Sequence, residues 1–251
     1  MAGDARKPRP GPKRDTYGYQ TLRPINWLVF LLPLLAFFQW GMMTYGTELL
    51  VPRYLQGFLR FFGGGAAWLP GVFIVVVLLA QQAAHKDGWA VQPTAVAGMA
   101  GESIFWTFPL IALNLVTGYA AAPKAAASWL SPQASDAVQK GLYAVGAGIY
   151  EEFVFRLILI SLLMLIFVDI LGLRRDAVAI GAVLVSALLF ALCHFTYPEL
   201  AGNAHFDRGR FIFFVTAGVY WGGLFVFRGL AVAAGSHILW DLYALLASDN
   251  A

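Results

Sequence analysis

Six ionisable side chains within the apolar segments of the second half of this sequence are of types and spacings that could do chemistry. They are Glu151, Glu152, Arg156, His194, His237 and Asp241. Ionisable groups inside a membrane span are costly, and such groups usually mark a functional site. Carboxylates and imidazoles are also the side chains that most often move protons in hydrolytic reactions. The set therefore predicts a polar centre inside the membrane, with the chemistry of a general base and its partners.

Helical spacing separates the roles of the first three residues. Glu151 and Glu152 are adjacent, so on a helix they project about 100° apart. Glu152 and Arg156 stand four residues apart and can pair directly. We therefore expect Arg156 to orient Glu152, which leaves Glu151 on the adjoining face. There Glu151 can meet a partner from another helix and act as a general base.

The two histidines of the set lie in later apolar segments. Asp241 follows His237 by four residues, so it can orient His237 or share its substrate site. Glu151, His194 and His237 would also make a fair zinc shell, and the spacing alone leaves a metal site open. Two other interpretations of such residues are hydrogen bonds that hold helices together and a proton relay in a carrier. Six residues on three helices favour a site over either of them.

The composition places the chain among membrane proteins. Of its 251 residues 59% are hydrophobic and only 12% are charged, whereas soluble domains carry about 25% charged residues. The single cysteine, Cys193, excludes an intramolecular disulfide and a cysteine-rich metal cluster. The basic residues are dispersed in the tail and loops, which indicates membrane topology rather than nucleic-acid binding.

Apolar segments define the expected architecture, because a membrane-spanning helix needs about 20 mostly apolar residues. The seven predicted spans are residues 25–45, 66–84, 103–122, 140–173, 176–197, 210–227 and 229–246. At 1.5 Å per residue the fourth would reach about 50 Å, against a hydrocarbon core of about 30 Å. It must tilt, protrude or break. An eighth span results if it breaks, or if the interfacial segment 48–62 inserts.

We therefore predict an all-α polytopic bundle of seven to eight transmembrane helices. Residues 1–24 are expected to be a disordered basic cytoplasmic tail, residues 25–138 the N-terminal transmembrane helices and residues 139–247 the catalytic region. The basic tail predicts a cytoplasmic N-terminus, and we expect a bacterial cytoplasmic membrane. In that orientation Glu151 lies about 16 Å along its helix from the outer side, in the outer half of the membrane or near its middle.

Three ordered motifs resemble those of one protease family. The hexapeptide "EEFVFR" at 151–156 matches an EExxxR pattern, "FALCH" at 190–194 matches FxxxH, and "HILWD" at 237–241 matches HxxxN/D in its Asp form. In this order they resemble the CPBP family, which comprises CAAX prenyl proteases of type 2 and Abi-type bacteriocin-processing intramembrane proteases. The resemblance covers residues 141–246.

The resemblance implies an intramembrane endopeptidase. Its substrate would be a peptide, or a prenylated or membrane-associated protein, at the lipid bilayer. It implies that Glu151 activates water beside His194, that Glu152 and Arg156 support the site, and that His237 and Asp241 stabilise the oxyanion or bind a metal. The Phe190 of the second motif is expected to pack so as to orient His194. Zinc remains open. The alternative is a non-catalytic scaffold or bacteriocin-immunity-type protein with the same fold.

Overall fold

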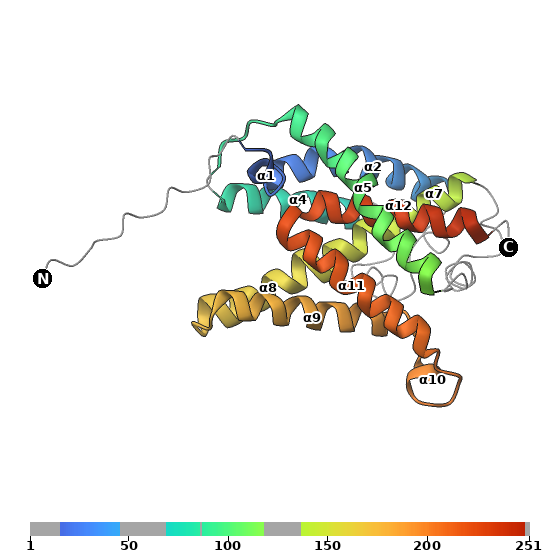
Figure 1. Cartoon of the computed structure of the whole chain (residues 1–251). Coiled ribbons are helices and arrows are strands. Elements are labelled where there is room, and N and C mark those ends of the chain that lie inside the picture. Colours follow the sequence, from blue (N-terminus) through green and yellow to red (C-terminus); the bar gives the residue numbers. More distant parts are fainter. Residues whose placement is uncertain (1–15, 46–68, 86, 118–136, 249–251) are drawn as a thin grey trace, which may run out of the picture.

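The computed structural model describes residues 16–45, 69–85, 87–117 and 137–248. Every regular element among these residues is helical (Figure 1), which confirms the all-α prediction. The elements are α1 (Tyr17–Gln20), α2 (Pro24–Tyr45), α4 (Leu69–Ala84), α5 (Pro93–Thr117), α7 (Ala137–Glu152), η2 (Phe153–Ile160), α8 (Ser161–Met164), η3 (Leu165–Ile170), α9 (Arg175–Cys193), α10 (Tyr197–Leu200), α11 (Arg208–Arg228) and α12 (Leu230–Ser248).

Each predicted span corresponds to a helical segment. Six segments of the described chain are long and apolar enough to cross a membrane, and α4 is a shorter apolar helix. The third span begins ten residues before its predicted start, at Pro93. Its first turns contain small and polar residues that lower the local hydropathy, while a proline is well suited to the first position of a helix. The interfacial segment 48–62 lies outside the described residues.

The fourth span does not break. Residues 137–170 form one helical run of 34 residues, here called the long helix, which contains the π-helical stretches η2 and η3. The first π-helical stretch begins at Phe153, directly after the two glutamates. The Ser186 hydroxyl of α9 donates a hydrogen bond of 2.7 Å to the Phe155 carbonyl within it. Short π-helical stretches inside α-helices occur frequently at functional sites.

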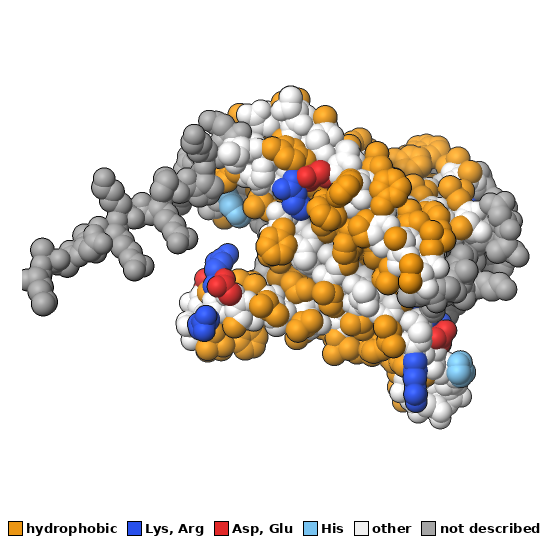
Figure 2. Space-filling model, viewed as in Figure 1, with side chains coloured by type: hydrophobic (Ala, Val, Ile, Leu, Met, Phe, Trp, Pro, Cys, Tyr) orange, Lys and Arg blue, Asp and Glu red, His pale blue; other side chains and the backbone are white. Residues whose placement is uncertain are grey.

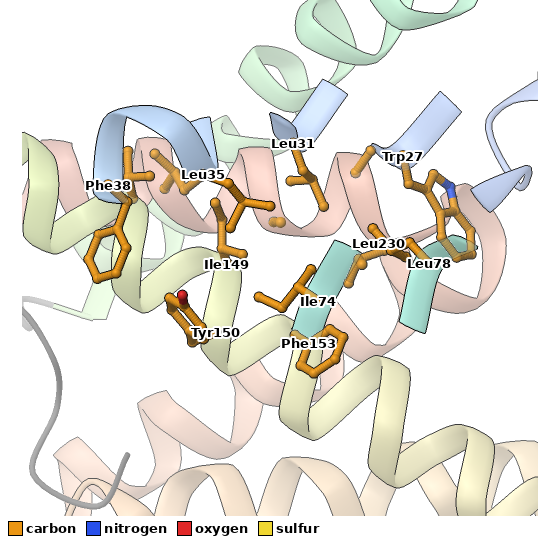
Figure 3. Close-up of a cluster of buried hydrophobic side chains, with 14 of the residues drawn as sticks. Trp27, Leu31, Leu35, Phe38, Ile74, Leu78, Ile149, Tyr150, Phe153 and Leu230 are labelled. Carbon is orange, nitrogen blue, oxygen red and sulfur yellow. The ribbon is translucent and has the colours of Figure 1, made fainter. Parts of the chain in front are cut away.

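Two apolar cores hold the helices together. The first joins α2, α4, α7 and α12, and Figure 3 shows Leu31 and Leu35 of α2 near Ile149 of α7. The second joins the long helix, α9, α11 and α12 through large aromatic rings, among them Phe190 and Trp221. In Figure 1 α11 passes from α10 and α9 to the start of α12, and it packs on both α9 and α12.

The outer surface is that of an integral membrane protein. Figure 2 shows hydrophobic side chains over most of the described part of the visible face, with charged side chains gathered in a few groups. Large apolar side chains on the outer faces of α5 and α9 are exposed, for example Phe105, Phe108, Ile180 and Leu184. A contiguous apolar surface of this kind would be unstable in water and is suited to lipid.

The predicted disordered tail is wrong for its last residues. Residues 17–20 form α1, and Gln20 and Arg23 are buried. The Arg23 guanidinium donates to the Gln20 side chain and to the carbonyls of Gly88 and Ala90. The composition of the tail does not reveal this order because the carbonyl acceptors of Gly88 and Ala90 lie more than 60 residues away in the sequence. Residues 1–15 lie outside the described residues.

These contacts belong to a larger cluster at the N-terminal end of the bundle, here called the tail-side network. Its members are Gln20, Arg23, Asn26, Gln82 and the backbone of residues 87–92. Asn26 donates to the Gln20 carbonyl at 2.9 Å, and Gln82 donates to the Asp87 carbonyl at 3.2 Å. The network fixes the starts of α2 and α5 and the end of α4.

Candidate active site

All six predicted residues converge on one place in the bundle. Glu151, Glu152 and Arg156 come from the long helix, His194 from the end of α9, and His237 and Asp241 from α12. Glu151, Glu152, Arg156 and His237 are at most 3% exposed. Charged side chains reach such burial only when other polar groups surround them.

Glu152 connects Arg156 to His237. Its Oε2 lies 3.2 Å from Arg156 Nε, so the predicted pair is confirmed. Its Oε1 lies 2.8 Å from His237 Nδ1 and accepts the hydrogen bond that orients this ring. Asp241 does not orient His237 in that way, because its Oδ2 stands 3.7 Å from the other ring nitrogen, Nε2. Asp241 therefore faces the reactive side of His237 and shares the site with it.

A close approach of α7 and α12 makes the Glu152–His237 contact possible. Gly148 faces Ile238, and a Cβ at position 148 would lie only 2.5 Å from Ile238 Cγ1 and 2.9 Å from its backbone nitrogen. Small residues at such a crossing let two membrane helices come close together. The glycine therefore sets the distance between the glutamates of α7 and the histidine of α12.

His194 lies at the turn that ends α9. Its Nδ1 is 2.8 Å from the Phe190 carbonyl, and the rings of Phe190 and His194 are 4.6 Å apart between centroids. This confirms the prediction that Phe190 packs against His194. A carbonyl can only accept, so Nδ1 of His194 is the donor. In the neutral ring Nε2 then carries the lone pair and acts as an acceptor.

Both histidines direct their Nε2 atoms at Glu151. Oε2 of Glu151 is 3.8 Å from Nε2 of His194 and 3.7 Å from Nε2 of His237. Direct hydrogen bonds would bring such atoms to about 2.7–3.2 Å. Polar atoms separated by more than about 3.5 Å are commonly bridged by water. The geometry thus suits one water molecule, or one polar atom of a substrate, held by all three side chains.

The donor types of Glu151, His194 and His237 suit zinc. Ligands about 2.0–2.2 Å from a tetrahedral zinc ion lie about 3.3–3.6 Å from one another, and the separations of 3.7 and 3.8 Å around Glu151 are slightly longer. Within the described part of the chain no group of three or more His, Cys, Asp or Glu side chains is arranged to hold a metal ion.

Two aromatic residues of α11 also belong to the site, although no motif contains them. Phe214 stacks on His194 with ring centroids 4.0 Å apart, and Trp221 stacks on His237 at 3.8 Å. In the sequence, neither residue is distinguished by type from the many other aromatic residues of the apolar segments. The seven-residue spacing of Phe214 and Trp221, which places both on one helix face, is the signal that could have identified them.

One comparison with known proteins gives a match. Residues 133–243 match the family model described as "Type II CAAX prenyl endopeptidase Rce1-like". This range contains all six candidate residues and α11. No curated protein and no solved structure matches the chain.

Proposed function

We propose that this chain, whose residues 133–243 match the Rce1-like family model, cleaves peptide bonds in a peptide or membrane-associated protein by activating water with glutamate and histidine. The family match supports a CAAX-type intramembrane protease in general. The observation that carries the finer proposal is the convergence of His194 Nε2 and His237 Nε2 on Glu151 Oε2, at 3.8 and 3.7 Å.

Water activation begins at Glu151 and His194. Both facing atoms are hydrogen-bond acceptors when the carboxylate is ionised and the imidazole is neutral. A water molecule between them donates one hydrogen to each. As its oxygen attacks the carbonyl carbon of the scissile bond, one O–H bond breaks and the proton passes to Glu151. Proton transfer to a positioned base of this kind contributes about 10²–10⁴ in rate.

His237 serves the developing oxyanion. Its Nδ1 is held by Glu152, so in the imidazolium form Nε2 can donate to the carbonyl oxygen as negative charge forms there. Donors fixed in place before the reaction are worth about 10²–10³ in rate. Arg156 holds Glu152 in turn and keeps the pair from reorganising. The protonated Glu151 then delivers its proton to the leaving amine, which yields a new carboxyl group and a new amino group.

The same geometry supports a proposal for the side from which substrate arrives. Figure 1 places α1 and the start of α9 at one end of the bundle and α10 at the other. His194 lies at the α10 end of α9, while Arg174 and Arg175 lie at its start. If the end of the bundle that carries Arg174 and Arg175 is cytoplasmic, the site opens toward the opposite face of the membrane. Exported or membrane-embedded peptides then fit better than cytoplasmic ones.

Single-cysteine labelling tests this orientation. In a Cys193→Ser background, Tyr197→Cys places an exposed thiol at the α10 end of the bundle. Trp89→Cys places an exposed thiol at the opposite end, in the loop before α5. A membrane-impermeant maleimide added to intact cells should label Tyr197→Cys and should label Trp89→Cys only after lysis. The reverse pattern would place the α10 end in the cytoplasm.

Hydrolysis itself is tested by product analysis. Purified protein in detergent is incubated in H₂¹⁸O with farnesylated and unmodified versions of the same peptides, and the products are identified by mass spectrometry. An endopeptidase yields two fragments, of which the N-terminal one carries ¹⁸O in its new carboxyl group. Comparison of the two peptide sets decides whether a prenyl group is required. A non-catalytic scaffold would yield no fragments from either set. A parallel incubation with a metal chelator tests whether hydrolysis depends on a metal ion, and we expect the activity to be retained.

A further inference from the structure

Helix α11 contributes none of the six motif residues, yet it contacts three of them. Phe214 stacks on His194 and Trp221 stacks on His237, while the Gly218 carbonyl between them accepts a hydrogen bond of 3.3 Å from Arg156. Positions 214, 218 and 221 follow a spacing of four and three residues, so they form one stripe along the helix. This set is here called the α11 stripe.

The stacking is close and nearly parallel. The rings of Trp221 and His237 lie 3.8 Å apart with an angle of 13° between their planes, and those of Phe214 and His194 lie 4.0 Å apart at 28°. Trp221 is only 2% exposed. Its Nε1 has no hydrogen-bond partner among the residues that the structure describes. The face of the indole ring, rather than its polar atom, is therefore what meets His237.

Gly218 allows the stripe to reach the histidines. A Cβ at position 218 would lie 2.8 Å from the Ala187 Cα and 3.0 Å from its Cβ. The glycine thus lets α11 lie directly against α9. Because α9 carries His194 at its end, this contact brings Phe214 over that ring and leaves the Gly218 carbonyl within reach of Arg156.

The histidines need this second restraint. Each one is held at Nδ1 by a short hydrogen bond, His194 to the Phe190 carbonyl and His237 to Glu152. Such a bond fixes the position of Nδ1 but still allows the ring to tilt about it. A tilt would move Nε2 away from Glu151. A flat partner on the ring face removes this freedom, because stacking fixes the plane of the imidazole.

We propose that the α11 stripe is the positioning element of this site, with Phe214 and Trp221 setting the ring planes of His194 and His237. Its catalytic consequence rests on the proposed function, whereas its structural consequence does not. A displacement of about 1 Å at a reacting group can cost 10²-fold in rate. Phe214 and Trp221 act through the histidines and need not touch substrate.

Histidine NMR tests the positioning directly and without any substrate. The chain has only four histidines, so ring-labelled protein gives a simple spectrum. An aromatic ring stacked on an imidazole shifts its ring protons upfield. Trp221→Leu should move the His237 signals downfield and leave those of His194 in place. Phe214→Leu should move the His194 signals downfield and leave those of His237 in place. Trp221→Phe should keep most of the His237 shift.

Trp240→Leu is the matched control. Trp240 is also buried, at 4% exposure, and its ring packs on Phe213 and Tyr243. The Trp240→Leu substitution removes the same side-chain volume from the same aromatic core, and it should shift the NMR signals of neither His194 nor His237. The proposal is overturned if Trp221→Leu leaves the His237 signals unchanged, or if Trp240→Leu moves them equally. Should Trp221→Leu fail to fold, Trp221→Phe decides, since loss of the shift there would also contradict stacking.

Turnover then tests the consequence for catalysis. Trp221→Leu should lower kcat by roughly tenfold to a hundredfold with KM nearly unchanged, because ring orientation matters most in the transition state. Trp221→Phe should stay within about threefold of the parent, and Trp240→Leu within about twofold. Equal losses in Trp221→Leu and Trp240→Leu would show a general packing effect. NMR shifts as expected in a protein without peptidase activity would refute the proposed function and leave the positioning intact.

Discussion

The tail-side network and the candidate site are both polar clusters buried in an apolar bundle, and they differ in how their atoms meet. In the tail-side network side-chain donors reach acceptors directly, as in the bonds from Arg23 to the Ala90 carbonyl at 3.0 Å and from Asn26 to the Gln20 carbonyl at 2.9 Å. In the site, Glu151 Oε2 and His194 Nε2 face each other at 3.8 Å. Both are acceptors in the forms that the mechanism uses.

This difference in contact distance distinguishes buried polar groups that stabilise the fold from buried polar groups that are positioned for chemistry. Direct hydrogen bonds satisfy buried groups and hold the chain, each contributing about 0.5–1.5 kcal/mol. Two acceptor atoms that face each other form no hydrogen bond between themselves, and they call for a donor with two hydrogens, which water provides. The Glu152–Arg156 pair, at 3.2 Å, is the structural part of the site and keeps the acceptor pair in place.

The largest expected effect comes from the acceptor pair. His194→Ala should lower kcat by about 10²–10⁴ because the water loses its second acceptor. Its free energy of unfolding should also fall, by about 1–3 kcal/mol, because the imidazole gives up its hydrogen bond to the Phe190 carbonyl. Asn26→Ala in the tail-side network should lower the free energy of unfolding by a similar amount, about 1–3 kcal/mol, with kcat per folded molecule unchanged. Turnover and denaturation of the two variants check this, and equal losses of turnover in both would remove the distinction between the clusters.

The buried charge pair should give the largest loss of stability. Arg156→Met leaves Glu152 buried without its cation, and such a loss costs about 3–5 kcal/mol. Arg23→Met removes hydrogen bonds to neutral carbonyls and should cost about 1–3 kcal/mol. Unfolding in mixed detergent compares them. The double variant Arg156→Met with Glu152→Gln should regain part of the loss. If it regained none, the charge of Glu152 would not be the cause.

Helix packing around the site predicts a smaller effect. Gly218→Ala puts a methyl group 2.8 Å from the Ala187 Cα, and overpacking of this kind costs about 1–3 kcal/mol. A methyl group at Gly223, in the same helix, would meet no atom within 4 Å. Gly223→Ala should therefore be neutral or stabilising by up to about 1 kcal/mol, from helix propensity. Thermal unfolding of the pair measures the difference, and equal transition temperatures would argue against a tight α9–α11 contact.

The smallest effect concerns pH at the α10 end. Burial acts to raise the pKa of Glu199, but hydrogen bonds from Thr196 and Arg210 outweigh it and lower that pKa below its usual value. The folded state therefore binds this proton less tightly than the unfolded state. The resulting stability is present above about pH 4.3 and is lost as the pH falls through the folded-state pKa. It amounts to at most about 1 kcal/mol.

Glu199→Gln checks that pH dependence. Above about pH 5 the variant should be slightly less stable than the parent, and the two unfolding curves should approach each other as the pH falls. A constant difference across the acid range would show that ionisation of Glu199 does not stabilise this turn.

How much the sequence predicts depends on whether a contact lies within one helix or between two. The Glu152–Arg156 pair follows from spacing alone, and the ordered motifs indicate that Glu151, His194 and His237 share a site. The partner of His237 could not be derived in this way. Asp241 lies one turn away on the same helix, but the approach of α7 to α12 at Gly148 gives the closer contact to Glu152.

Other features could not be predicted from the sequence, for related reasons. The π-helical stretch after Glu152 leaves no pattern in residue types. The α11 stripe consists of aromatic and glycine residues that are common in any membrane helix. The spacing of Phe214 and Trp221 places them on one helix face, but their contacts are needed to assign that face to the site. Order in residues 16–24 depends on acceptors in the loop before α5, far away in the sequence.

The central claim is that Glu151 is the base that activates water, and a matched pair of glutamate variants tests it most directly. Glu102 is a less deeply buried carboxylate of the same bundle, and it pairs with Arg228. Turnover of one membrane peptide is measured for the parent, Glu151→Gln and Glu102→Gln in the same detergent. We predict a loss of at least about a hundredfold in Glu151→Gln, with an unchanged unfolding transition, and turnover within about threefold of the parent in Glu102→Gln. Full turnover in Glu151→Gln, or equal losses in both variants, would contradict the assignment of Glu151 as the base.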